Sequence, residues 1–165
     1  MQGSLGAESL PDEYQMPVDT EALQTAEDIA KPCEGFRARP YLCPAGVWTI
    51  GYGSTFNSDG SPVRPTDPPV SEPEAAGRLR GLFLTVYIPG TQKLVPTLTG
   101  QDLGSISDFA FNLGLTRLAG STLRKKLLAG DMEGARQELQ KWVRGGGRVL
   151  PGLVIRRKLE AAKLG

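Results

Sequence analysis

In one stretch of the chain, residues 47–56, large apolar residues alternate with small ones. In every other periodic segment, the apolar residues recur at helical spacing. Alternation predicts a strand with two different faces. One face carries Trp48, Ile50 and Tyr52, and the other carries Thr49, Gly51 and Gly53. The glycines leave the second face bare, which indicates that a ligand approaches the backbone there. One short strand region among many helical segments predicts an α+β fold.

Helical periods lie on both sides of this strand. A first helix is expected from Asp19, because apolar residues recur three or four positions apart up to Cys33. Pro32 removes a backbone hydrogen bond, so we expect it to kink this helix or to begin a new turn just before Glu34. Residues 57–73, rich in proline, serine and aspartate, are expected to form a loop.

Further helices are expected after this loop, each marked by a capping residue, a glycine or a proline. Ser71 with Glu74 begins the first, over residues 75–87, Thr99 begins the second, which ends at Gly114, and Ser121 begins the third, which ends at Gly130. Asp131 begins the fourth, which includes Trp142 and Val143 and ends at Gly145. Pro151 begins the last, which contains Leu153, Ile155, Leu159 and Ala162. We therefore expect a small N-terminal lobe with a short antiparallel sheet and a larger C-terminal helical lobe. The folded domain occupies residues 19–165, and residues 1–18 are expected to form a flexible tail.

Histidine is absent from the chain. Nucleophile pairs of the Ser-His-Asp and Cys-His types and histidine-ligated zinc sites are therefore excluded. Proton transfer must come from carboxylates, thiols, tyrosine or lysine, and we expect neither a metal nor a cofactor. No run of about 18 apolar residues occurs, and no basic region precedes an apolar core at the N-terminus, so we expect neither a membrane span nor a secretory signal.

The net charge is +1, but the charged residues are unevenly distributed along the chain. Residues 1–33 carry seven acids against Lys31, whereas residues 114–165 carry twelve basic residues against four acids. The basic half is suited to a polyanion such as a nucleic acid or an anionic cell-wall polymer. Solvated charge on helix surfaces explains the same composition, and the sequence leaves both interpretations open.

Three residues of different proton affinity lie close to the helix-to-strand transition. Glu34 is a candidate general acid if apolar surroundings keep it protonated, and otherwise a solvated partner of Arg37. Cys43, whose unperturbed pKa is about 8.5, either assists a water or fills space as a small hydrophobe. Thr49 either orients a water by hydrogen bonding or serves only as a β-branched strand residue.

The spacing of these residues resembles a known family. Glu34, eight residues, Cys43, five residues and Thr49 are similar to the Glu-x8-Asp/Cys-x5-Thr pattern of the phage-type lysozymes, the endolysins of glycoside hydrolase family 24. The resemblance covers residues 20–165. It continues through residues 50–53, 109–114 and 121–123, Trp142 and residues 147–160.

The resemblance implies a lysozyme-like fold and a peptidoglycan muramidase that lyses the bacterial cell wall during phage release. Glu34 would protonate the glycosidic oxygen of the β-1,4 bond between N-acetylmuramic acid and N-acetylglucosamine. Cys43 would take the place of the usual aspartate, and Thr49 would help to hold the attacking water. Two alternatives stay open: a lytic transglycosylase, and a non-catalytic lysozyme-like module that binds the wall within a virion.

Further positions follow from the same resemblance. Ser54 stands where many relatives have histidine, so a helper of Glu34 is either missing or replaced by Arg37. Two positions resemble those that line or support the junction between the lobes: Asn112 and Ser121. Three arginines would meet peptide carboxylates or anionic wall polymers across the cleft, or else carry ordinary surface charge: Arg148, Arg156 and Arg157.

The resemblance also sets expectations for partners and location. The expected partner is bacterial peptidoglycan, with no nucleic acid, and the expected state is a monomer. The chain would be made in the host cytoplasm and would reach the wall through a holin-type pore or with a virion. Cys33 and Cys43 either pair as a regulatory disulfide or remain separate thiols.

Overall fold

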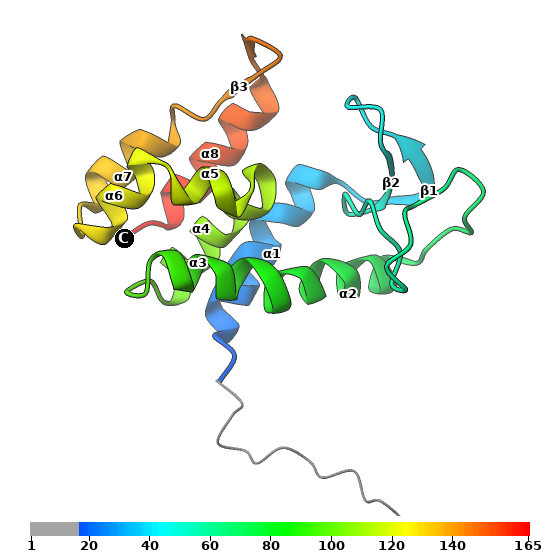
Figure 1. The fold of residues 1–165 in the computed structure, drawn as a ribbon, viewed down its shortest axis with the longest axis horizontal. Coiled ribbons are helices and arrows are strands. Elements are labelled where there is room, and N and C mark those ends of the chain that lie inside the picture. The colour runs from blue at the N-terminus through cyan, green and yellow to red at the C-terminus, as the bar shows by residue number, and fades with distance from the viewer. Residues whose placement is uncertain (1–16) are drawn as a thin grey trace, which may run out of the picture.

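The computed structural model describes residues 17–165, so residues 1–16 of the expected tail lie outside the described part of the chain. Figure 1 shows a hairpin on one side of the molecule and the C-terminal helices on the other, with α2 running between them. This is the expected arrangement of a small sheet-bearing lobe and a larger helical lobe. None of the helices in residues 17–165 is long and apolar enough to cross a bilayer.

The first helix, α1 (Thr20–Glu34), begins where the sequence predicts and ends on the acid. Asp19 Oδ1 accepts a hydrogen bond from the Ala22 amide at 2.9 Å, and Asp19 Oδ2 accepts one from the Gly100 amide at 2.8 Å. Asp19 therefore caps α1 and also the start of α4 (Gly100–Leu113), far along the chain. Of the two alternatives expected at Pro32, a kink or a new turn, the new turn is wrong, because α1 continues through this residue to Glu34.

The sheet consists of β1 (Arg37–Leu42) and β2 (Trp48–Gly51), paired antiparallel with Leu42 opposite Trp48. The strand is shorter than expected because Gly51 and Gly53 adopt φ values of 66° and 78°, which reverse the chain. Ile50 and Ser54 then exchange two backbone hydrogen bonds of 2.9 Å.

Part of the bare glycine face is occupied by the protein itself: Thr49 and Gly51 are buried, whereas Gly53 is partly exposed and stays open to a ligand. A Cβ on Gly51 would lie 2.9 Å from the Cβ of Ala75 in α2, and a Cβ on Gly53 would lie 2.7 Å from Oε2 of Glu34. The two glycines therefore let α2 and the candidate acid approach the hairpin.

A long helical segment joins the two lobes. It comprises α2 (Glu72–Leu82), the π-helical turn η2 (Phe83–Tyr87) and α3 (Ile88–Leu94). Ser71 caps α2 as predicted, accepting a hydrogen bond from the Glu74 amide at 3.2 Å. The helix was expected to end near residue 87, and this expectation is wrong. The wider turn just before Pro89 accommodates the missing amide, and the helix continues beyond it.

The C-terminal lobe is built around α4. It contains α5 (Leu115–Ala119), α6 (Thr122–Leu128), α7 (Met132–Leu139), a hairpin of β3 (Arg144–Gly145) and β4 (Arg148–Val149), and α8 (Pro151–Lys163). The sequence did not predict α5 or this hairpin, and Trp142 and Val143 lie beyond the end of α7. Trp142 nevertheless packs on Phe109, with ring centroids 5.5 Å apart.

The helix α8 buries three of its charged side chains and exposes much of its apolar surface. Arg156, Arg157 and Glu160 are at most 4% exposed, whereas Ile155 is 58% and Leu159 is 40% exposed. Residues 151–163 form a helix as expected, but two of the apolar residues that mark it in the sequence face outward. The inner face of α8 carries charge because it lies against acidic side chains of α1 and α4, described below.

We expect Asp19→Ala to lower the free energy of unfolding by about 2 kcal/mol, because it removes a helix cap and a second hydrogen bond to another helix. Chemical denaturation followed by circular dichroism measures this loss. Asp28→Ala is the matched control, since the Asp28 carboxylate is on the same helix and accepts an exposed hydrogen bond from Gln24. Equal losses in the two variants would contradict a bridging role for Asp19.

Candidate active site

A cleft of about 1040 Å³ lies between the hairpin and the helical segments. Glu34 and Cys43 both line it, so the structure brings the first two members of the predicted set together. Ser54 and Asn112 line it as well, from the hairpin and from α4. The cleft is large enough for several sugar-sized groups, and its walls come from segments far apart in the sequence.

Glu34 is held by one oxygen and presents the other toward the cleft-lining hairpin. Its Oε1 accepts a hydrogen bond from Nη1 of Arg156 at 2.7 Å, while its Oε2 lies against Gly53. The side chain of Glu34 is 23% exposed, so it is mostly enclosed but still open to the cleft. Gly35, at a φ of 70°, ends α1 here and turns the chain toward β1.

Arg156 connects Glu34 to a second, fully buried acid. Its Nε and Nη2 donate to the two carboxylate oxygens of Asp108 in α4, at 2.9 and 2.7 Å. Burial opposes the charge on this guanidinium, but the contacts with Asp108 and Glu34 outweigh it and raise the pKa of Arg156. Arg156 therefore remains charged and fixes the position of Glu34.

Arg157, beside it on α8, is completely buried. Its Nη2 donates to Oε1 of Glu160 at 2.6 Å and to Oδ1 of Asn112 at 2.8 Å. The expectation that Arg156 and Arg157 meet wall polymers is therefore wrong, because both are buried against acids of the protein. They act inside the protein, and Asn112 links them to the cleft wall.

Cys43 and Thr49 face each other across the hairpin turn. The Cys43 amide donates to the Val47 carbonyl at 3.0 Å, and Thr49 Oγ1 donates to the same carbonyl at 3.0 Å. Hydrogen bonding from the Val47 backbone, and further from Ala45, Thr49 and Gly46, lowers the pKa of the Cys43 thiol although partial burial opposes this. Thr49 is 4% exposed, so it supports Cys43 from within the sheet.

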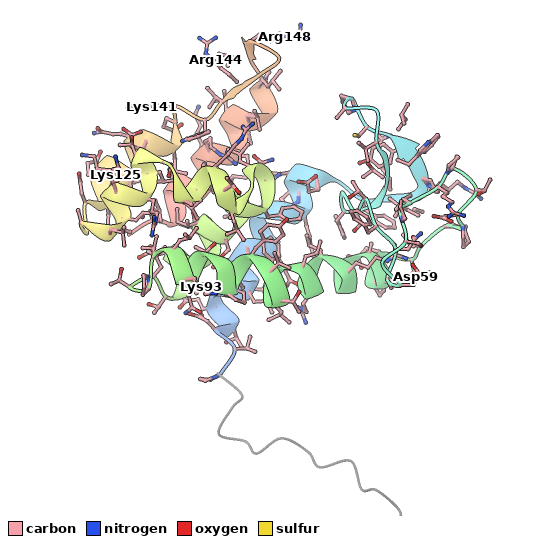
Figure 2. All side chains as sticks on the ribbon, in the orientation of Figure 1. Asp59, Lys93, Lys125, Lys141, Arg144 and Arg148 are labelled. Carbon is pink, nitrogen blue, oxygen red and sulfur yellow. The ribbon has the colours of Figure 1, made fainter. Side chains whose placement is uncertain are left out.

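Three other predicted residues lie elsewhere. Arg37 stacks over the ring of Tyr41, with its guanidinium carbon 4.4 Å from the centroid, and Arg156 occupies the helper position beside Glu34. Ser121 is the buried cap of α6, accepting from the Arg124 amide at 3.0 Å. Arg148 is exposed in β4, and Figure 2 shows it near Arg144 at the tip of the hairpin.

Two acids of the site escaped the sequence prediction, namely Asp108 and Glu160. A signal for each was present. Asp108 is the one charged residue in the segment 103–110 of α4, and Glu160 follows Arg157 at the three-residue spacing of a helical ion pair.

The two cysteines are free thiols, and their surroundings differ. Burial raises the pKa of Cys33, and the acids Asp108, Glu160 and Glu34 add to this, whereas Arg156 opposes it. Cys33 thus lies on the inner, acidic side of the site, and Cys43 on the cleft side.

We expect iodoacetamide to alkylate Cys43 faster than Cys33 near neutral pH, because the thiolate is the reactive form and the two pKa values are shifted in opposite directions. Mass spectrometry of peptides after short exposures measures the two rates. In the urea-unfolded chain the rates should converge. Faster alkylation of Cys33 in the folded protein would refute the assigned environments.

Comparison with known proteins identifies the family. The family model described as "Phage lysozyme" matches residues 31–160. An endolysin of Acyrthosiphon pisum secondary endosymbiont phage 1 is 38% identical over 139 residues, covering 81% of this chain and 90% of that protein. A SAR-endolysin of Escherichia phage Mu is 33% identical over 129 residues, covering 78% and 72%.

Solved structures agree with the fold. The endolysin from Escherichia coli O157:H7 phage FAHEc1 superposes with a TM-score of 0.76 at 24% identity, covering 91% of this chain and 94% of that one. The active form of the P1 phage endolysin Lyz gives 0.72 at 25% identity, covering 86% and 83%. The predicted lysozyme-like α+β fold is confirmed. With its sequence matched from the end of α1 to the buried charges of α8, the chain belongs to the phage lysozyme family.

Proposed function

We propose that this glycoside hydrolase cleaves the β-1,4 bond between N-acetylmuramic acid and N-acetylglucosamine in peptidoglycan, with Glu34 as its acid. The observation that carries the proposal is the orientation of the Glu34 carboxyl. One oxygen is fixed by Arg156, and the other lies beside the cleft-lining Gly53, where a proton can pass to a bound sugar.

In the proposed reaction, Glu34 donates its proton to the glycosidic oxygen as the bond to the anomeric carbon breaks. The leaving sugar departs as a neutral alcohol, and positive charge develops on the ring that stays behind. A water attacks that carbon, and its proton passes to the thiolate of Cys43. Glu34 ends as a carboxylate beside Arg156, which stabilises the charge left by the transferred proton.

Cys43 suits the role of base because of its hydrogen bonds. Those from the Val47 backbone and from Thr49 favour the thiolate and lower the pKa of Cys43. We propose that Thr49 supports this role from within the sheet, through its contacts with Cys43 and the Val47 carbonyl. We propose attack from the side opposite the leaving sugar, and therefore inversion, because a thiol that receives a proton from water forms no bond to the sugar.

Apolar side chains in the cleft suit the faces of sugar rings. Phe56 is 60% exposed and Leu82 is 37% exposed, and they line the cleft from the segment after β2 and from α2. Exposed apolar groups of this size within a cleft are typical of a ligand site. We propose that the glycan strand lies between them.

We also propose that the chain acts as a monomer and binds no nucleic acid. A pore or a virion would deliver it to the cell wall.

We expect Glu34→Gln to reduce wall lysis by at least about 10²-fold, because the amide keeps the shape and the contact with Arg156 but has no acidic proton. Turbidity of cell-wall suspensions measures the rate, and circular dichroism confirms that the variant folds. Glu133→Gln, on the surface of α7, is the control and should be fully active. Lysis at the parental rate by Glu34→Gln would remove Glu34 from the reaction.

Mass analysis of the released muropeptides separates the proposed hydrolase from its rivals. Hydrolysis adds one water to each cleaved bond and leaves a reducing sugar. An anhydro product would identify a lytic transglycosylase, and the absence of products alongside wall binding would identify a non-catalytic module.

We expect Cys43→Asp to keep its activity and Cys43→Ala to lose about 10²–10⁴-fold, because only the first retains a proton acceptor. The pH range of Cys43→Asp should move to lower pH, since a carboxyl ionises at lower pH than a thiol. Initial rates of wall lysis between acidic and alkaline pH measure both effects. Parental rates in Cys43→Ala would make the thiol a structural residue.

A further inference from the structure

One cationic side chain lines the cleft among the described residues, and it belongs to Arg78 of α2. Glu34 is the one carboxylic acid among the same lining residues. Arg156 and Arg157, which were expected to meet peptide carboxylates, are paired with acids of the interior instead. Arg78 is therefore the cation that an anionic group in the cleft would meet.

Arg78 lies one helical turn from Leu82, the apolar residue that we place beside the glycan. Arg78, Gly81 and Leu82 all line the cleft, because residues three and four positions apart share one face of a helix. The helical rise separates Arg78 from Leu82 by about 6 Å along the axis. A Cβ on Gly81 would meet nothing from the rest of the protein within 4 Å, so the surface there is open. A substituent of a sugar bound at Leu82 can therefore reach Arg78.

The guanidinium of Arg78 is held in place and still has donors to spare. Its Nη2 donates to Oε1 of Glu74 at 2.9 Å, and its Nη1 donates to Oδ1 of Asn57 at 3.3 Å. A guanidinium carries more N–H groups than these two bonds use, in a rigid planar fork. The side chain of Arg78 is 14% exposed, whereas that of Glu74 is 50% exposed. Because Glu74 is half solvated, the pair is weak and leaves Arg78 able to bind a second anion.

The other side of Arg78 is lined with acids. Arg78 also lines a second cavity of about 390 Å³, together with Asp59, Asp67 and Glu74. Figure 2 shows Asp59 near the start of α2. Hydrogen bonds from neighbouring side chains and backbone amides lower the pKa values of Asp59 and Asp67, so both are ionised at neutral pH. These acids repel an anion, which confines an anionic partner of Arg78 to the cleft side.

We propose that Arg78 is a specificity-determining residue, which pairs with a carboxylate of the peptide attached to N-acetylmuramic acid. This inference rests on the proposed function, in which the glycan lies beside Leu82. The peptides of peptidoglycan carry free carboxylates, whereas the rings of the glycan are neutral. A guanidinium can bind a carboxylate through two parallel hydrogen bonds. The enzyme thereby prefers glycan whose peptides carry free carboxylates to glycan without that charge.

A change in the substrate tests this preference directly. Treatment of purified peptidoglycan, free of phosphate polymers, with carbodiimide and ammonia converts the peptide carboxylates to neutral amides and leaves the glycosidic bonds intact. We expect the parent to lose about 10-fold in kcat/KM on the amidated substrate, mainly through a higher KM, because charge-assisted hydrogen bonds are lost. The release of reducing ends measures the rates.

Three variants show whether Arg78 causes the preference. We expect Arg78→Gln to cleave both substrates with the same kcat/KM, near that of the parent on the amidated one. Arg78→Lys keeps the charge but not the planar fork, so it should retain part of the preference. Arg64→Gln is the matched control, since Arg64 is an exposed cation of the same lobe that does not line the cleft. This control should respond to amidation as the parent does.

A merely structural role of Arg78, in which it only ties Asn57 to α2, predicts a different outcome. Arg78→Gln would then lose the same factor on both substrates and keep the preference of the parent. That outcome would overturn the proposal. Equal kcat/KM of the parent on the two substrates would also overturn it, and this comparison requires no variant. If the parent releases no reducing ends from untreated peptidoglycan, the proposed function itself is refuted.

Discussion

The guanidinium of Arg156 is the contact on which the rest of the site depends. Three of its N–H groups bind two carboxylates, Asp108 in the centre of α4 and Glu34 at the end of α1. Without that cation, two acids would face each other in a region from which water is largely excluded. The same contacts hold α8 against α1 and α4. One side chain therefore sets both the position of Glu34 and the packing of α8.

The two sides of the cleft are held by different physical means. Glu34 is fixed from the interior through a buried ionic network, whose strength comes from the low polarity around it. Cys43 is fixed by backbone hydrogen bonds of a small, partly exposed hairpin. The acid side is therefore held by buried charges, whereas the thiol lies beside the exposed turn 44–47 of a two-stranded sheet. Adjustment to a bound glycan is expected mainly on the side of the hairpin.

Local signals in the sequence predicted local structure well. Asp19, Ser71, Ser121 and Asp131 cap helices where expected, because a cap depends on residues within three positions. The spacing of Glu34 and Cys43 likewise predicted that both line one cleft. Long-range contacts were not predictable in this way. The bond from Asp19 to Gly100 spans 81 positions, and no local pattern encodes it.

Apolar periodicity predicted the helix α8 but not which of its side chains are buried, because this helix buries charged ones. In α8 the apolar residues Ile155 and Leu159, which mark the helix in the sequence, face outward. The helix turns Arg156, Arg157 and Glu160 inward instead. Charged side chains are seldom buried unless partners are present, and those partners lie on other helices. The roles proposed for Glu34, Cys43 and Thr49 are chemical, so they stay predictions until the variants are measured.

The acid and its cation are 122 positions apart, and this separation bears on when the enzyme becomes competent. During synthesis α1 is made before the other described helices, whereas α8 is made after them. Until α8 docks, Glu34 and Asp108 lack the charge that organises them. A chain in which α8 has not docked therefore carries Glu34, Cys43 and Thr49 but lacks the cation that holds Glu34 in place.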